Sequence, residues 1–111
     1  MKIQEQQHGA VSVLRAQGPL IKVDCDKFKV RLLEATKENF GRVVLDASGI
    51  PFIDSNGLET LVDVTGELAQ SGQSLKLCGV NKTIREVFEL TGISSQFEHF
   101  EDLNSAVRSF L

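Results

Sequence analysis

The feature that most constrains this fold is the order in which strand-like and helix-like hydrophobic patterns follow one another along the 111 residues. Two strand-like segments come first, and helix-like and strand-like segments then alternate to the end. The strand-like segments are residues 2–7, 10–16, 43–45, 74–78 and 96–100. Such alternation predicts a mostly parallel sheet with right-handed crossovers, here preceded by an N-terminal hairpin. We expect an α/β fold of order ββαβαβαβα, in a single domain over residues 1–111.

Polar residues indicate where most of the helices begin. Asp24, Asn81 and Asp102 are expected N-caps of the first, third and fourth helices. The second helix is expected from Leu58 and has the cleanest helical period. Its apolar stripe consists of Leu58, Leu61, Val62, Thr65, Leu68 and Ala69.

Composition narrows the classes of function. The formal net charge is −3, and Lys and Arg are scattered singly, which argues against nucleic-acid or anionic-membrane binding. Cys25 and Cys78 form no CxxC motif and are expected to be buried thiols of a cytosolic protein. Residues 1–7 lack the apolar core of a signal peptide, and no run approaches the roughly 18 apolar residues that span a bilayer. We expect a cytoplasmic protein without membrane insertion.

One loop connects a strand to a helix and also carries polar side chains and a glycine at the helix start. Residues 50–58 join the third strand to the second helix and place Asp54, Ser55 and Gly57 at the helix start. In open α/β sheets, binding sites lie at the carboxyl ends of the strands. This loop is at such an end, so it is the first place to look for a function.

Two interpretations of the loop are open. In the first, Asp54 or Ser55 only caps the helix, Pro51 fixes the turn, and Gly57 relieves crowding. In the second, the surplus of polar groups serves a partner, because one helix needs one cap and Gly57 lets another chain approach the backbone. Phe52, an apolar ring in a loop, would then contact that partner.

A phosphate on Ser55 is compatible with the second interpretation. It would lie at a helix N-terminus, where backbone N–H groups and the helix dipole favour an anion. It would also add a charge of about −1.5 to −2 beside Asp54. Such a modification would change the surface while leaving the fold intact.

These residues also resemble the signature of a known family. Residues 53–58, Ile-Asp-Ser-Asn-Gly-Leu, preceded by the strand of residues 43–46, are similar to the signature of STAS domains. That family includes the bacterial anti-sigma factor antagonists. Residues 18–20, Gly-Pro-Leu, fall where the family has a strand-to-helix turn, so the resemblance covers nearly the whole chain.

The resemblance implies partner switching. Ser55 would be phosphorylated by an anti-sigma factor that is a serine kinase and uses ATP. The unphosphorylated chain would bind that kinase and free a sigma factor, and a phosphatase, of the PP2C type, would reset the switch. Asp54 would support recognition, and Gly57 would allow close approach. Asn56 stands where relatives often have Ser or Thr, so a second phosphorylation site is absent there.

An acidic row lies on the second helix, opposite its apolar stripe. Glu59, Asp63 and Glu67 are spaced i, i+4, i+8, and no Lys or Arg occurs between Val43 and Leu75. Like charges at i, i+4 destabilise a helix by roughly 0.2–0.5 kcal/mol per pair, so helix stability does not explain them. The row is either a solvated face or a docking surface for a basic region of the kinase.

Two other functions are alternatives to the switch. An enzyme is disfavoured because His8 and His99 are the only histidines, and the GxSxG, HExxH and Walker A motifs are absent. We therefore expect no catalysis, no metal and no cofactor. A STAS module that never meets a kinase, as a scaffold or a subunit of a lipid ABC transport assembly, is the second alternative. Ser55 beside Asp54 favours the switch.

Overall fold

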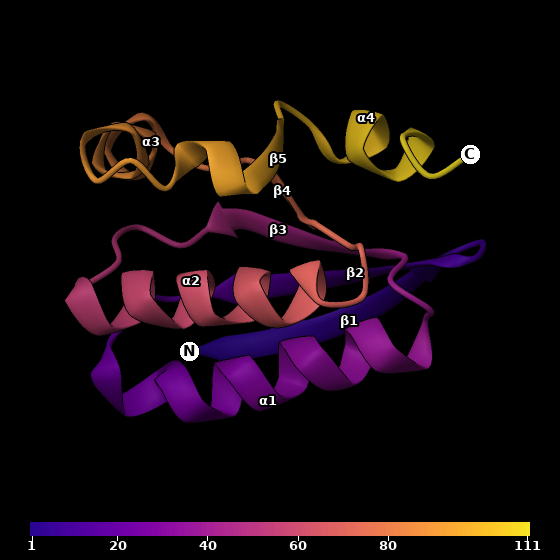
Figure 1. Ribbon diagram of the computed structural model, residues 1–111, viewed down its shortest axis with the longest axis horizontal. Coiled ribbons are helices and arrows are strands. Elements are labelled where there is room, and N and C mark those ends of the chain that lie inside the picture. Colours follow the sequence, from indigo (N-terminus) through magenta and orange to yellow (C-terminus); the bar gives the residue numbers. More distant parts are fainter.

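The computed structural model describes residues 1–111 and shows a five-stranded sheet with helices on both faces (Figure 1). The strands are β1 (Lys2–His8), β2 (Val11–Gln17), β3 (Val43–Gly49), β4 (Leu75–Cys78) and β5 (Phe97–Phe100). They lie side by side in sequence order, with β1 antiparallel to β2 and every later pair parallel. The predicted N-terminal hairpin and mostly parallel sheet are therefore confirmed.

Four helices and one short 3₁₀ turn connect the strands. They are α1 (Lys22–Glu38), α2 (Ser55–Ala69), α3 (Lys82–Leu90), the 3₁₀ turn η1 (Ser94–Gln96) and α4 (Leu103–Arg108). The order ββαβαβαβα is the predicted one. None of these helices has the length and hydrophobicity that crossing a bilayer requires.

Two apolar clusters hold the layers together. The larger one lies between one face of the sheet and α1, α2 and α3, and its members include Leu14, Phe28, Leu45, Leu61 and Phe88. The smaller one lies between the other face and α4, and consists of Val11, Val13, Val44, Cys78 and Ala106. Because β3 contributes to both clusters, it is buried on both faces, as its unbroken apolar run predicts.

Helices α1 and α2 run side by side and begin at the same end of the molecule (Figure 1). Helix α1 starts at Lys22, so the expected cap at Asp24 is wrong; the residue at the cap position is Ile21, whose side chain makes no cap hydrogen bond. The Asn81 and Asp102 caps are confirmed, because their side chains accept the N–H groups of Ile84 and Ser105, each at 2.8 Å.

Helix α2 begins at Ser55, before the expected start at Leu58, and its buried face differs from the expected stripe. Leu58 and Val62 are only half-buried, and Ala69 is exposed. Thr60, instead, is buried, and its hydroxyl donates to the Asn56 carbonyl oxygen at 2.9 Å. The buried residues are Gly57, Thr60, Leu61, Val64, Thr65 and Leu68.

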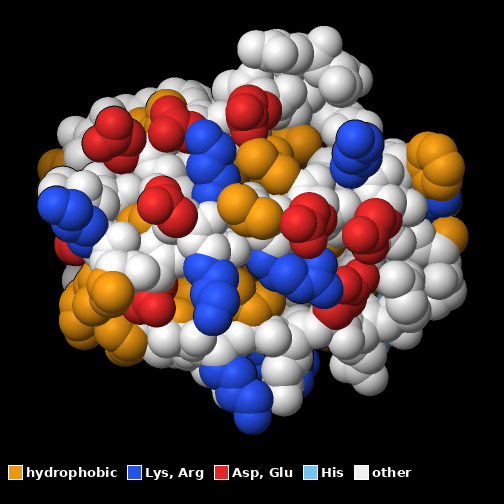
Figure 2. Space-filling model, turned by 90° about the horizontal axis from the view of Figure 1, so that it is seen from below, with side chains coloured by type: hydrophobic (Ala, Val, Ile, Leu, Met, Phe, Trp, Pro, Cys, Tyr) orange, Lys and Arg blue, Asp and Glu red, His pale blue; other side chains and the backbone are white.

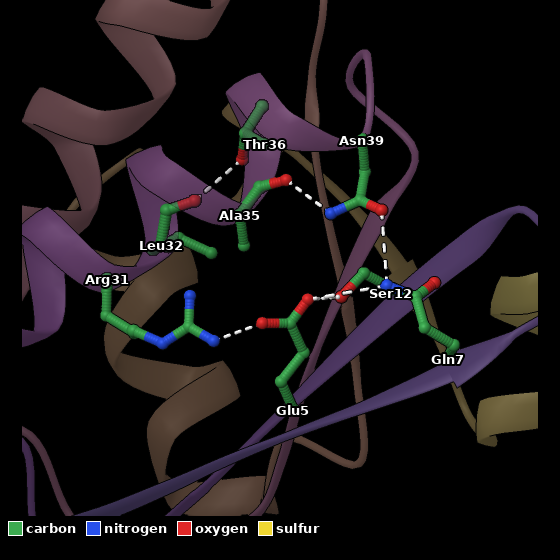
Figure 3. Close-up of polar contacts among 8 residues, drawn as sticks. All are labelled: Glu5, Gln7, Ser12, Arg31, Leu32, Ala35, Thr36 and Asn39. Carbon is green, nitrogen blue, oxygen red and sulfur yellow. Dashed lines mark hydrogen bonds and ion pairs between the residues drawn. The ribbon is translucent and has the colours of Figure 1, made fainter.

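A polar cluster ties α1 to the hairpin (Figure 3). The Glu5 carboxylate accepts hydrogen bonds from the Ser12 hydroxyl at 2.6 Å and from the Arg31 guanidinium. Both donors hold the pKa of Glu5 below its ordinary value. Around this contact, the surface over α1 carries interspersed basic and acidic side chains (Figure 2). The cluster secures the edge strand, whose sequence is otherwise mostly polar.

Both cysteines are buried and free, as expected. Burial raises the pKa of the Cys78 thiol to about 12, and the nearby Asp46 carboxylate adds to the rise. Asp46 itself is buried at the sheet, where it accepts hydrogen bonds from the Arg15 side chain and the Ser48 backbone, each at 3.0 Å.

Candidate functional site

The loop between β3 and α2 is held from two sides. On one side it pairs with the chain that leads into α1: Leu20 N–H donates to the Phe52 oxygen at 3.1 Å, and Asp54 N–H donates to the Leu20 oxygen at 3.2 Å. On the other side, the Asn81 side-chain amide donates to the Pro51 oxygen at 3.0 Å. The loop is thus fixed at the carboxyl edge of the sheet, between α1 and α3.

Asp54 caps two helices with one carboxylate. Its Oδ1 accepts the Gly57 N–H of α2 at 2.8 Å, and its Oδ2 accepts the Lys22 N–H of α1 at 3.0 Å. The hydrogen bond from Gly57, followed by the one from Lys22, holds the pKa of this carboxyl below its ordinary value. Asp54 is therefore the cap of α2, and it is ionised at neutral pH.

Ser55 is left free by this arrangement. It is the first residue of α2, it is exposed, and its hydroxyl makes no hydrogen bond within the chain. The first N–H groups of a helix lack intrahelical partners, and Asp54 satisfies only that of Gly57 in α2. An exposed hydroxyl thus lies at the electropositive end of a helix, with Asn56 half-buried beside it.

Gly57 is buried, and the chain itself makes the close approach to it. A Cβ at this position would lie 2.5 Å from both the Leu20 oxygen and the Ile53 Cγ2. Glycine is therefore required for α2 to pack against the strand-to-helix turn before α1. Internal packing explains this residue without any partner.

Phe52 places an apolar surface beside Ser55. Its side chain remains 53% exposed. With Ile53 and Leu58 it borders a small hollow of about 50 Å³, closed on the other side by Ile84 and Val87 of α3. The hollow is narrow, so it offers a rim for apolar contact rather than a cavity for a ligand.

The acidic row continues directly from Ser55. Glu59, Asp63 and Glu67 are all exposed, and none takes part in an ion pair. Together with Ser55 they follow one another at intervals of four residues, which places them along one side of α2. The structure thus joins the hydroxyl and the acidic row into one surface.

Several residues outside this surface have structural roles. Asn81 both caps α3 and holds Pro51, and only its cap could be read from the sequence. The His99 ring packs against Phe88 and Phe97, which also contact each other, and its Nε2 lies 3.0 Å from the Ser94 oxygen. The structure therefore does not bring a histidine to Ser55. No three His, Cys, Asp or Glu side chains lie close enough to share a metal ion.

Comparison with known proteins agrees with this architecture. The BtrV protein of Bordetella bronchiseptica, which bears the name of an anti-sigma factor antagonist, is 30% identical over 94 residues, covering 85% of this chain and 81% of BtrV. A Thermotoga maritima structure under the same family name gives a TM-score of 0.86 at 18% identity, covering 96% of this chain and 92% of the other. The phosphorylated form of the Bacillus cell fate determinant SpoIIAA gives 0.71 at 18% identity, covering 99% and 100%.

These two structures, at this level of identity, describe the fold alone. The family itself follows from the sequence match, since a model of the STAS domain matches residues 2–106, nearly the whole chain. The chain belongs to the STAS domain family.

Proposed function

We propose that this protein is an anti-sigma factor antagonist that works by partner switching, with Ser55 as its phosphoacceptor. The unphosphorylated chain binds an anti-sigma factor serine kinase, which then releases its sigma factor. Phosphorylation of Ser55 by that kinase ends the binding, and a PP2C-type phosphatase restores the unphosphorylated form. The chain itself acts as a binding module in the cytoplasm and needs no cofactor.

The observation that carries this proposal is the free Ser55 hydroxyl at the start of α2. Asp54 already caps the helix, so Ser55 is not needed for folding and is exposed for modification. Two names support the same role: the relative BtrV bears the name of an anti-sigma factor antagonist, and the similar fold SpoIIAA is known in a phosphorylated form.

The chemistry is a phosphoryl transfer. The kinase moves the γ-phosphoryl group of ATP to the Ser55 oxygen: the new O–P bond forms, the bond to ADP breaks, and a base of the kinase takes the hydroxyl proton. The product carries about −1.5 to −2 charge beside the ionised Asp54 and ahead of Glu59. This crowding of like charges weakens binding to a partner whose site faces Ser55 and also holds an anionic nucleotide.

The docking surface has an apolar and a charged part. Phe52 and the adjoining hollow supply apolar contact next to the phosphoacceptor. Glu59, Asp63 and Glu67 extend the surface along α2 and suit a basic region of the kinase. Asp54, Asn56 and Gly57 shape the start of α2, because the first caps it and the last allows its close packing.

The test uses capture from the source cells and transfer in vitro. The wild type and Ser55→Ala are expected to capture an ATP-binding anti-sigma kinase, identified by mass spectrometry, and Ser55→Glu is expected to lose it. Ser105→Glu is the matched control, because it adds the same charge at an exposed position of α4, on the other face of the sheet from α2, and should leave capture unchanged. With ATP, the captured kinase should add a phosphate mass to the wild type but not to Ser55→Ala.

Two results would overturn the proposal. One is tight capture of the kinase by Ser55→Glu. The other is capture of a transporter ATPase with no phosphate on Ser55 under any growth condition, which would support the transport-assembly alternative instead.

A further inference from the structure

The edge of the sheet opposite Ser55 holds a second hollow, of about 260 Å³. It lies between the loops that precede β3 and β4, residues 40–42 and 72–74, and is completed by Lys76 and Phe110. Both loops enter parallel strands, so the hollow is at their amino ends, whereas Ser55 follows a carboxyl end. The hollow therefore lies at the other end of the sheet from Ser55, and a role for it is independent of the proposed phosphorylation.

Lys76 is a buried cation without a carboxylate partner. It is only 9% exposed, and its Nζ donates one hydrogen bond, to the Ser109 hydroxyl at 2.7 Å. The ammonium lies 3.8 Å from the Phe110 ring centroid, yet two of its three N–H donors have no acceptor in the chain. Its cross-strand neighbour Glu98 accepts a hydrogen bond from Ser74 instead. Because buried charges are normally paired, an anion in the hollow would suit the two free donors of this ammonium.

Arg42 adds a second cation to the lining of the same hollow. Its Nε donates to the Ala10 oxygen at 3.1 Å, and it forms no ion pair. Its guanidinium lies 5.8 Å from the centroid of the Phe40 ring. Phe40 is 78% exposed and has a φ of 55°, the one non-glycine residue in the left-handed region. Phe40 takes this conformation as the residue after the C-cap of α1, in a Schellman turn that the Gly41 N–H closes by donating to the Thr36 oxygen at 2.9 Å.

The residues around the hollow determine which ligand fits. None of them is Asp or Glu, and Gln73 adds a side-chain amide to the two cations, whereas the Ser74 hydroxyl already donates to Glu98. The fork of a guanidinium matches phosphate oxygens in pairs, and an ammonium complements it as a point charge. The volume is below that of sites for drug-sized ligands, so the ligand has little bulk beyond its charged group. We propose that this hollow binds a small phosphate-bearing anion between Arg42 and Lys76.

The experiment is a titration of the ¹⁵N-labelled full chain with inorganic phosphate, followed by ¹H–¹⁵N correlation spectra at constant ionic strength. Chloride and acetate are titrated in parallel, to separate phosphate recognition from screening and from binding of any carboxylate. Saturable shifts are expected with phosphate at residues 40–42, 72–76 and 109–110.

Three variants decide the assignment. Lys76→Met keeps the apolar stem and Arg42→Gln keeps a polar side chain at the surface, and each is expected to weaken phosphate binding at least about tenfold. Arg85→Gln removes the same charge from a half-buried position on α3 and should bind as the wild type does. The same spectra report whether each variant is folded, and Arg42→Gln remains informative if Lys76→Met is not.

The proposal fails if the folded Lys76→Met or Arg42→Gln variant binds phosphate as tightly as the wild type. It also fails if phosphate shifts residues around Lys82 and Arg85 as strongly as those around the hollow, since that pattern is general attraction to surface cations.

Discussion

The Asp54 carboxylate accepts the backbone N–H of Lys22 at 3.0 Å, so the residue that caps α2 is also the side-chain cap of α1. The proposed phosphoacceptor, Ser55, is the next residue in the chain. Helices α1 and α2, two of the three that cover one face of the sheet, run side by side and therefore begin at a single anion (Figure 1). A charge added at Ser55 would lie at the N-terminus of α2, next to the carboxylate that both helices share.

Because Asp54 caps two helices, we expect Asp54→Asn to lower the melting temperature more than Asp102→Asn does. An Asn side chain has one acceptor oxygen, which can keep the bond to Gly57, while its NH₂ group cannot accept the Lys22 N–H. We expect the melting temperature to fall by several degrees and the Lys22 amide to exchange faster with solvent. Asp102 caps α4 through a single oxygen, so Asp102→Asn should be nearly neutral; equal melting temperatures for the two variants would contradict the shared cap.

Replacing each of the two glycines of α2 with alanine is expected to change the free energy of unfolding in opposite directions. Gly57→Ala puts a Cβ 2.5 Å from the Leu20 oxygen and should lower the free energy of unfolding by about 1–3 kcal/mol. Gly66 has no atom within 4 Å of its virtual Cβ and is exposed, so Gly66→Ala should raise the free energy of unfolding by about 0.5–1 kcal/mol. Urea unfolding measures both changes, and a destabilised Gly66→Ala would show that its environment differs from the one described.

The fold could be predicted from the sequence because its signals are local. The alternation of periods indicates the strand and helix order, and the Asn81 and Asp102 caps lie within three residues of the N–H groups they accept. The start of α1 could not be predicted, because Asp54, which caps it, is 32 positions away. The contact between Arg31 and Glu5 could not be predicted either, because the two residues are far apart in the sequence. The helical period alone places Arg31 on the outer face of its helix.

The site could be predicted less completely. The motif indicated that Asp54 and Ser55 were both candidate caps of α2, but it did not distinguish them. The structure assigns the cap to Asp54, because its carboxylate accepts the Gly57 N–H. Gly57 showed that something approaches the backbone, yet the sequence could not show that Leu20 does so from within the chain. The phosphorylation of Ser55 and the contacts with a kinase remain predictions.

Stability is expected to fall in acid, partly through Asp46. Burial raises the pKa of Asp46, but hydrogen bonds from Ser48 and Arg15 outweigh it, so its net pKa is below the ordinary value near 4. A lowered folded-state pKa means that the ionised group stabilises the fold above the unfolded-state pKa, and that this stability is lost as pH falls through the folded-state pKa. The free energy of unfolding should therefore decline below about pH 4.

Asp46→Asn tests this origin of the acid dependence. The variant is expected to be less stable than the wild type at neutral pH and to lose less stability between about pH 6 and pH 3, because the group that titrates has been removed. Denaturant unfolding at a series of pH values measures both. An unchanged slope in Asp46→Asn would assign the acid dependence to other carboxylates, such as Glu5.

The acidic row on α2 makes a kinetic prediction that rests on the proposed function. If Asp63 and Glu67 steer a basic surface of the kinase, reversing both to Lys should slow association by up to about tenfold at low salt and flatten its dependence on ionic strength. Dissociation should change less, because both side chains are exposed and surface pairs are weak. Stopped-flow mixing with the captured kinase measures the two rates separately.

The matched control for this reversal is the double variant Glu86→Lys, Glu89→Lys, which reverses two exposed carboxylates on α3 instead of α2. It alters net charge in the same direction, so a slowing shared by both variants reports only the overall field of the protein. If only the α2 reversal slows association, the kinase docks on the side of α2 that carries Ser55. An unchanged association rate at low salt would leave Glu59, Asp63 and Glu67 as a solvated face, while leaving the role of Ser55 untouched.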